Sequence, residues 1–313
     1  MGAGDWYNAG ETSRRCHIMT NPHTPADANS NGPDYGPIFL AFMRNSLSRD
    51  MTFRANFLID CVSSLTWTAM NIGFYLLIFQ YTKQIGRDSG WGQYEFFIFL
   101  ATGMIINSVV QAFFMPNCEE LSELIRTGGL DFALLKPIDA QFLLSLQKIE
   151  WSALSNVVAA LVLIVYGVLN LLHRSGQPLA IDWFTVPLYL LYVACGIAIL
   201  YSLMIALSAT SIWLGRNQSL YDFWFYITNF SRYPMEIYDG PYGRPLRLAF
   251  TFVIPVLVVV NVPAQILAQP IVSAEAAVRL PLAVFTLFAT VFSLLASRWL
   301  FQKALEQYRS ASS

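Results

Sequence analysis

The sequence contains few charged residues: Asp, Glu, Lys and Arg make up 12% of its 313 residues. Soluble globular domains usually carry about 25% charged residues. Hydrophobic residues make up 55% of the chain, and apolar runs close to the length of a membrane-spanning helix recur along it. The shortage of charge therefore excludes an ordinary water-soluble domain and indicates a protein that crosses the membrane several times.

Several motifs that carry chemistry are also missing. The net charge is −1, so there is no basic excess that would attract nucleic acid. The 4 cysteines are isolated, and no CxxC or Cys/His spacing indicates zinc or a disulfide framework. The sequence has no GxxxxGK[ST] phosphate loop, no HExxH and no GxSxG. We therefore expect no ATPase motif, no catalytic residue and no cofactor or metal site on this chain.

The apolar runs predict an all-α membrane protein with six transmembrane helices. The predicted spans cover about residues 55–81, 95–115, 142–172, 184–214, 246–262 and 280–301. They lie in one domain, residues 37–307. A polar N-terminal tail, residues 1–36, is expected to be disordered because it has little apolar periodicity. A short C-terminal tail, residues 308–313, ends the chain.

The basic residues predict the orientation of these spans. Most of the 19 Lys and Arg residues fall in the N-terminal segment, the loops after spans two and four, and the C-terminal segment. Because cytoplasmic segments are enriched in Lys and Arg, this distribution favours both termini inside. Residues 117–141 and the aromatic segment Gly215–Arg244 are then cytoplasmic. The latter is either an interfacial helix or a second protein-contact element.

The segment from Asn117 to Gln141 is the one long polar interruption between apolar runs in the first half of the chain. Asn117 is a candidate N-cap with Glu120 as its capping-box partner, and Gly128-Gly129 lies where a C-cap glycine is expected. Between them, the apolar residues Leu121, Leu124 and Ile125 share one face, with the acidic residues Glu119, Glu120 and Glu123 early in the helix and Arg126 at its end. The pattern predicts an amphipathic helix of about 10 residues.

The run GGLDFALLKPIDAQF resembles a sequence motif in the first cytoplasmic loop of ABC-2 type transporter permeases, the membrane subunits of bacterial ABC exporters. The later run SIWLGRNQSLYDFWFYITNFSRYP is similar to the same branch, and the resemblance extends over about Phe39 to Gln307. It implies a multi-pass protein of the bacterial plasma membrane. It also implies a separate cytoplasmic ATPase that holds the ATP, and a second permease subunit, identical or related.

The resemblance assigns roles by position. The helix between spans two and three, about Cys118 to Thr127, corresponds to the family's coupling helix, which docks on the ATPase. Short outer helices between spans five and six correspond to about Pro263 to Val278. The implied docking residues are Glu119, Glu120, Leu121, Glu123, Leu124, Ile125 and Arg126. The implied supporting residues are Leu130, Asp131, Phe132, Leu135, Lys136 and Pro137.

The function expected from the resemblance is that of an ATP-driven permease subunit, an exporter, in contact with membrane lipids. Two other classes stay open. An ion-coupled secondary carrier or channel would transport without ATP, and a membrane scaffold subunit would bind partners but move no solute. A neighbouring reading frame for a phosphate-loop ATPase would favour the permease. The sequence does not choose between lipid, glycan, drug and peptide as the substrate.

Overall fold

A computed structural model describes residues 34–86, 90–174, 182–214, 218–269 and 276–312. These residues form helices and connecting segments, with no strand among them. Residues 1–33 of the predicted N-terminal tail lie outside this part of the chain. The chain divides into two units after residue 34, and the fold below is that of the second unit, residues 35–313.

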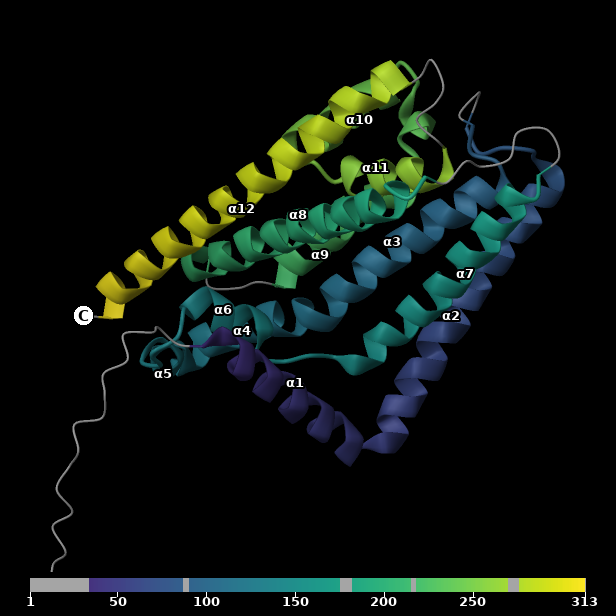
Figure 1. Cartoon of the computed structure of the whole chain (residues 1–313). Helices are drawn as coiled ribbons and strands as arrows, with labels where there is room; N and C mark the ends of the chain where they lie inside the picture. The colour runs from purple at the N-terminus through teal and green to yellow at the C-terminus, as the bar shows by residue number, and fades with distance from the viewer. Residues whose placement is uncertain (1–33, 87–89, 175–181, 215–217, 270–275, 313) are drawn as a thin grey trace, which may run out of the picture. The chain divides into compact units, whose positions relative to one another are not determined.

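The described residues build helices of very different length (Figure 1). The long ones are α1 (Tyr35–Thr52), α2 (Arg54–Tyr81), α3 (Gln93–Phe113), α7 (Ser155–Leu172), α8 (Thr185–Leu214) and α12 (Ala276–Ser312). The shorter α-helices are α4 (Met115–Thr127), α5 (Gly129–Leu134), α6 (Ala140–Leu146), α9 (Gln218–Asn229), α10 (Gly243–Leu248) and α11 (Leu257–Ala268). Single turns are η1 (Trp151–Leu154), η2 (Phe230–Arg232), η3 (Met235–Tyr238) and the π-turn η4 (Ala249–Val253).

Within the described ranges, 5 helices are long and apolar enough to cross a membrane: Arg54–Tyr81, Gln93–Phe113, Trp151–Leu172, Thr185–Trp213 and Leu280–Tyr308. Each overlaps one of the predicted spans. A continuous helix satisfies its own backbone hydrogen bonds, which the apolar interior of a bilayer requires. The all-helical membrane fold is therefore confirmed, and α12 continues through residues 308–312, which the sequence assigned to a tail.

Two predicted spans differ from the structure. The third, 142–172, is interrupted: α6 ends at Leu146, and residues 148–150 are not helical before η1 begins. The fifth, 246–262, is not one straight helix, because Gly243–Val253 and Leu257–Ala268 meet at a bend of 89°. Hydropathy cannot detect such breaks, since both arms of each are apolar. The bent pair is a sixth span only if its two arms form a single path across the membrane.

The predicted outer helices at 263–278 do not form a separate pair in the described part of this segment. Residues 263–268 are the last turns of α11, and residues 276–278 open α12. Pro263 lies inside α11 without ending it. Neighbouring helices in a membrane protein tolerate such a proline, because the freed backbone groups find other partners.

The segment after α8 runs along α3 from one end to the other. The far part of α8 lies near α4, because the two helices pack together and the Tyr201 ring of α8 lies 4.5 Å from the Phe114 ring at the end of α3. From there α9, η2 and η3 lead to the start of α3, where Trp91 Nε1 donates to Glu236 Oε2 at 2.9 Å. The interpretation of Gly215–Arg244 as a segment confined to one membrane face is therefore wrong for its described part. Nearby Arg247 pairs with Asp239, so it lies at the Trp91 end.

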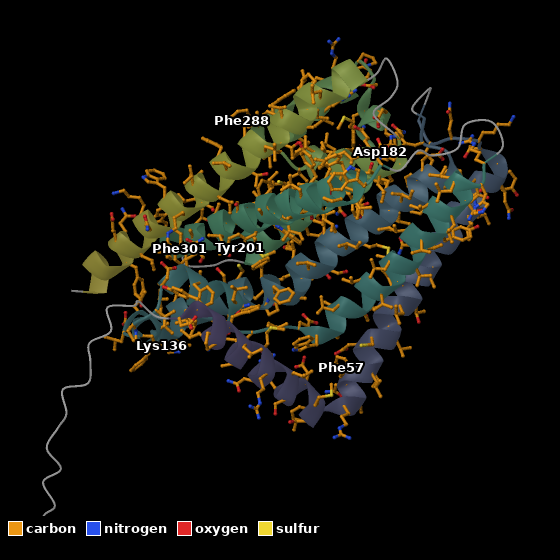
Figure 2. All side chains as sticks on the ribbon, in the orientation of Figure 1. Phe57, Lys136, Asp182, Tyr201, Phe288 and Phe301 are labelled. Atoms are coloured by element: carbon orange, nitrogen blue, oxygen red, sulfur yellow. The ribbon has the colours of Figure 1, made fainter. Side chains whose placement is uncertain are left out.

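The interior is built around α3, which packs along α7, while α8 packs along α12 and α11 (Figure 1). A Cβ on Gly196 of α8 would lie 2.8 Å from the carbonyl oxygen of Val259 in α11, so only glycine permits this approach. The apolar side chains of α2 and α12 are mostly exposed, as at Phe288 (Figure 2). Such a surface fits contact with lipid or with another membrane subunit.

Candidate functional site

Helix α4 forms where the amphipathic pattern predicts it. Leu121 is 1% exposed, and Leu124 and Ile125 pack partly buried against the same core. The helix ends at Gly128, whose φ of 72° is left-handed and suits glycine. The predicted N-cap, Asn117, is wrong: the helix begins at Met115, and Phe114 occupies the cap position without a side-chain hydrogen bond.

Asn117 instead ties α4 to the break before α7. Its Nδ2 donates to the carbonyl oxygen of Lys148 at 2.7 Å, and its Oδ1 accepts from the Lys148 amide at 2.7 Å. The next amide, of Ile149, donates to Ser46 Oγ of α1 at 3.1 Å. The amide of Glu150 donates to the carbonyl oxygen of Ala112 at 2.9 Å. The non-helical residues 148–150 are thus held from α1, α3 and α4 together.

The three glutamates of α4 have different surroundings. Glu120 forms an ion pair with Lys148, with Nζ 2.7 Å from Oε1. Glu119 and Glu123 are exposed. The side chain of Arg126 lies outside the described residues. Docking through Glu120 therefore requires a partner that competes with Lys148, whereas Glu119 and Glu123 face outward.

The predicted supporting residues after α4 also divide into two groups. Leu130 is buried and anchors α5. The other five are exposed: Asp131, Phe132, Leu135, Lys136 and Pro137. Phe132 is 74% exposed and Leu135 is 80% exposed, although both lie outside every candidate span. Large apolar side chains exposed in this way mark a contact with another protein or with the membrane surface.

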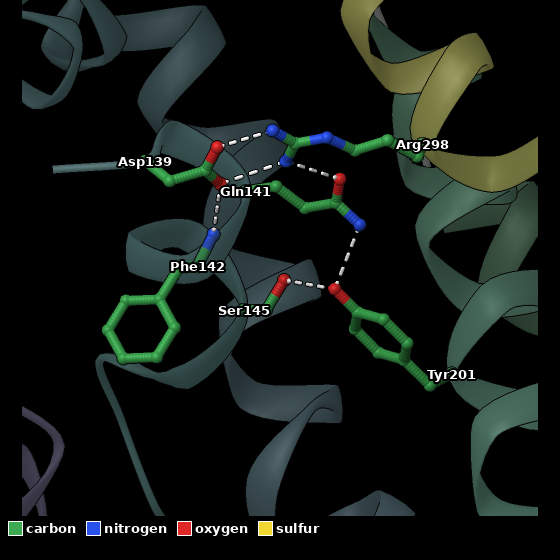
Figure 3. A network of polar contacts seen from close by, with 6 residues as sticks. All are labelled: Asp139, Gln141, Phe142, Ser145, Tyr201 and Arg298. Atoms are coloured by element: carbon green, nitrogen blue, oxygen red, sulfur yellow. Dashed lines mark hydrogen bonds and ion pairs between the residues drawn. The ribbon is translucent and has the colours of Figure 1, made fainter. Parts of the chain in front are cut away.

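A polar network joins α6 to the long helices (Figure 3). Asp139 caps α6 by accepting from the Phe142 amide at 3.0 Å. Arg298 of α12 donates through Nη1 to Asp139 Oδ1 at 2.9 Å and to Gln141 Oε1 at 3.0 Å. The Arg298 guanidinium holds the pKa of the Asp139 carboxyl below its usual range. The ion pair therefore fixes the start of α6 to α12.

The same network continues into α8. Gln141 Nε2 donates to the hydroxyl of Tyr201 at 3.0 Å, and Ser145 Oγ lies 3.0 Å from that hydroxyl (Figure 3). Asp139, Tyr201 and Arg298 were not among the site residues predicted from the sequence. Two signals were present: an aspartate three residues before Phe142 is a candidate N-cap, and an arginine within an apolar run requires a polar partner.

No group of three or more His, Cys, Asp or Glu side chains that could hold a metal occurs among the described residues. The region therefore combines exposed acidic and apolar side chains on α4 and α5 with hydrogen bonds that join α4 to the break before α7 and α6 to α8 and α12.

Residues 65–312 match the model of the family described as ABC-2 family transporter protein. The match includes most of α2 and all the later described helices, and it excludes α1. No curated protein and no solved structure matches the chain.

Proposed function

The chain belongs to the ABC-2 family of transporter proteins, and we propose that it is an exporting permease subunit driven by a separate ATPase through α4 and α5. The resemblance to the permease family is thereby confirmed. The chain is a multi-pass membrane protein and the membrane component of an ABC transporter, and permeases of this family generally work with a cytoplasmic ABC ATPase. The export direction and the site of docking are the parts that we propose.

The observation that carries the docking proposal is the exposure of Phe132 and Leu135 beside an acidic helix. Burying one such side chain contributes about 1.5–3 kcal/mol, whereas exposed ion pairs contribute about 0–1 kcal/mol each. The apolar pair would therefore supply most of the affinity. Glu119, Glu123, Asp131 and Lys136 would align the partner through charge, and Arg126 and Pro137 lie within the same segment.

Movement of the docked helices would reach the membrane spans by the two links described above. Asn117 connects α4 to the backbone that leads into α7, and Asp139 connects α6 to α12. A partner changes a conformational equilibrium only if its contacts differ between the two states. In a transporter with two permease subunits, the ATPase would present one docking site to each subunit. ATP binding would change the distance between these two sites, so the contacts with α4 and α5 would differ between the two states.

The orientation that this requires puts α4–α6 in the cytoplasm, with both termini inside, in the plasma membrane of a bacterium. Lys136, Lys148 and Lys303 lie on the side of α4–α6, which supports that orientation by the positive-inside rule. Arg247 pairs with Asp239 near Trp91, at the opposite end of α3. It therefore does not count among the basic residues on the cytoplasmic side. The exposed faces of α2 and α12 would contact lipid and a second permease subunit, identical or related.

The test is copurification of the cognate ABC ATPase with this chain. We expect Phe132→Ala/Leu135→Ala to reduce its association at least tenfold. The matched control, Leu40→Ala/Phe53→Ala, removes a Leu and a Phe that are 65% and 64% exposed elsewhere in the chain and should leave association unchanged. Equal association of both double variants would overturn the docking surface. Transport that continues without ATP hydrolysis and follows an ion gradient would instead support a secondary carrier.

A further inference from the structure

A cavity of about 370 Å³ lies between α2, α3, α9, η2 and α11, with α7 at one end. It follows α3 from Phe99 to Gln111, which at 1.5 Å per residue is about 18 Å. Among the described residues, its lining contains hydroxyl, amide and aromatic side chains and one arginine, but no Asp or Glu. An elongated polar cavity among apolar helices is a candidate ligand site, because polar groups in a membrane interior need partners.

The charged end of the cavity is defined by Arg232. Its guanidinium carbon lies 5.8 Å from the centre of the Phe225 ring. No ion pair joins Arg232 to a carboxylate within the described ranges. A cation–π contact leaves the positive charge uncancelled. The arginine fork matches a carboxylate or phosphate, so this end favours an anionic group and disfavours a cation.

The other end of the cavity carries neutral amides. Asn71 and Asn107 each donate through Nδ2 to their own helix, to Trp67 O at 2.9 Å and to Gly103 O at 2.8 Å. Their side-chain oxygens are then oriented to accept further hydrogen bonds. Gln111 extends this amide row along α3. The row therefore suits a ligand that offers hydroxyl donors.

Trp224 supplies an independent sign of a missing partner. Its ring lines the cavity and the residue is only 3% exposed. Its indole Nε1–H has no hydrogen-bond partner in the part of the chain that the structure describes. A buried donor without a partner costs free energy, because it has lost its hydrogen bond to water. A ligand oxygen in the cavity would remove that cost.

We propose that this cavity binds an elongated anionic amphiphile, with its phosphate or carboxylate on Arg232 and a hydroxyl-bearing part along Asn71, Asn107 and Gln111. The proposal rests on the permease function, for which such a molecule is the transported substrate. The aromatic rings of Tyr75, Phe99 and Trp224 provide flat apolar walls between the two ends. The site specifies one negative charge, because one arginine faces it.

The test measures ligand binding to the full chain in phosphatidylcholine nanodiscs, without any ATPase. The probes are dioctanoyl phosphatidylglycerol (anionic, with hydroxyls), dioctanoyl phosphatidylcholine (zwitterionic), octyl glucoside (neutral, with hydroxyls) and inorganic phosphate. We expect phosphatidylglycerol to bind at least tenfold more tightly than phosphatidylcholine. Arg232→Gln should abolish that preference, whereas Arg232→Lys should keep most of it. Asn107→Leu should weaken the binding of both phosphatidylglycerol and octyl glucoside.

The matched control is Arg244→Gln, which removes an exposed arginine outside the cavity and should bind like the wild type. Equal affinity for the two phospholipids, or equal losses in Arg232→Gln and Arg244→Gln, would overturn the proposal. Inorganic phosphate that binds as tightly as phosphatidylglycerol would also overturn it, because the site would then be one for a small anion. None of these outcomes depends on ATPase docking, so failure here is distinct from failure of the permease mechanism.

Discussion

The side chain of Asn117 forms two hydrogen bonds with the backbone of Lys148, one as donor and one as acceptor, each 2.7 Å long. The two residues are separated by 31 positions in the chain. An asparagine side chain that pairs with a peptide group in this way replaces the hydrogen bonds that a helix would have supplied. It allows the chain to leave the helical path between α6 and α7 without losing backbone hydrogen bonds.

Asn117→Ala should therefore destabilise the chain. Asn117 is buried, so the variant leaves both backbone groups of Lys148 without partners, at a cost of about 1–3 kcal/mol each. The measurement is the thermal unfolding midpoint of the purified chain in detergent. The control is Asn170→Ala, which loses only a bond to its own helix, to Tyr166 O. Equal midpoints for the two variants would show that the link to Lys148 contributes little.

The close approach of α8 and α11 gives a second prediction. In Gly196→Ala the new Cβ would meet the carbonyl oxygen of Val259 at 2.8 Å, so the helices must separate. Overpacking of this kind costs about 1–3 kcal/mol, and we expect a lower unfolding midpoint. In Gly73→Ala the new Cβ has nothing within 4 Å, and alanine favours helix over glycine by about 1 kcal/mol. A midpoint for Gly196→Ala as high as that for Gly73→Ala would contradict this packing.

The Asp139–Arg298 ion pair predicts a pH dependence. The pKa of Asp139 is depressed in the folded chain, chiefly by its hydrogen bond from Arg298. The pair therefore stabilises the fold above the ordinary Asp pKa of about 4, and this stabilisation is lost as the pH falls through the depressed value. Because both side chains are partly exposed, with relative accessibilities of 31% and 42%, the effect should be near 1 kcal/mol.

Asp139→Asn isolates this charge, because asparagine also serves as an N-cap. We expect its unfolding midpoint to lie below that of the wild type at pH 5–7, with the difference closing below about pH 4. Asp182→Asn, which removes an exposed carboxylate, should show no such convergence. A wild-type advantage that persists unchanged into strong acid would assign the effect to packing.

The sequence was sufficient to predict the elements that depend on local chemistry. The apolar runs located α2, α3, α8 and α12, and Gly128 marked the end of α4 because a left-handed residue there favours glycine. The amphipathic pattern also oriented Leu121 toward the core. Each of these features is determined by residues within a few positions of one another.

The features that escaped prediction depend on contacts between distant segments. Asn117 fits the pattern of a helix cap, and only the fold reveals that its partner is Lys148. Likewise, the aromatic segment after α8 has the composition of an interfacial helix. Its actual path along α3 is shown by the bond between Glu236 and Trp91, 145 positions apart. Polar residues in a membrane protein are ambiguous from sequence, because headgroups, water and other helices can all satisfy them.

The break at residues 148–150 has a consequence for how this region tolerates change. Its partners on α1, α3 and α4 hold main-chain atoms, which every amino acid except proline provides alike. These bonds therefore constrain the chain length here whatever the side chains, in addition to the constraints set by the buried Ile149 side chain and the Lys148–Glu120 ion pair. A single inserted or deleted residue would put the following amides out of register with all three helices at once.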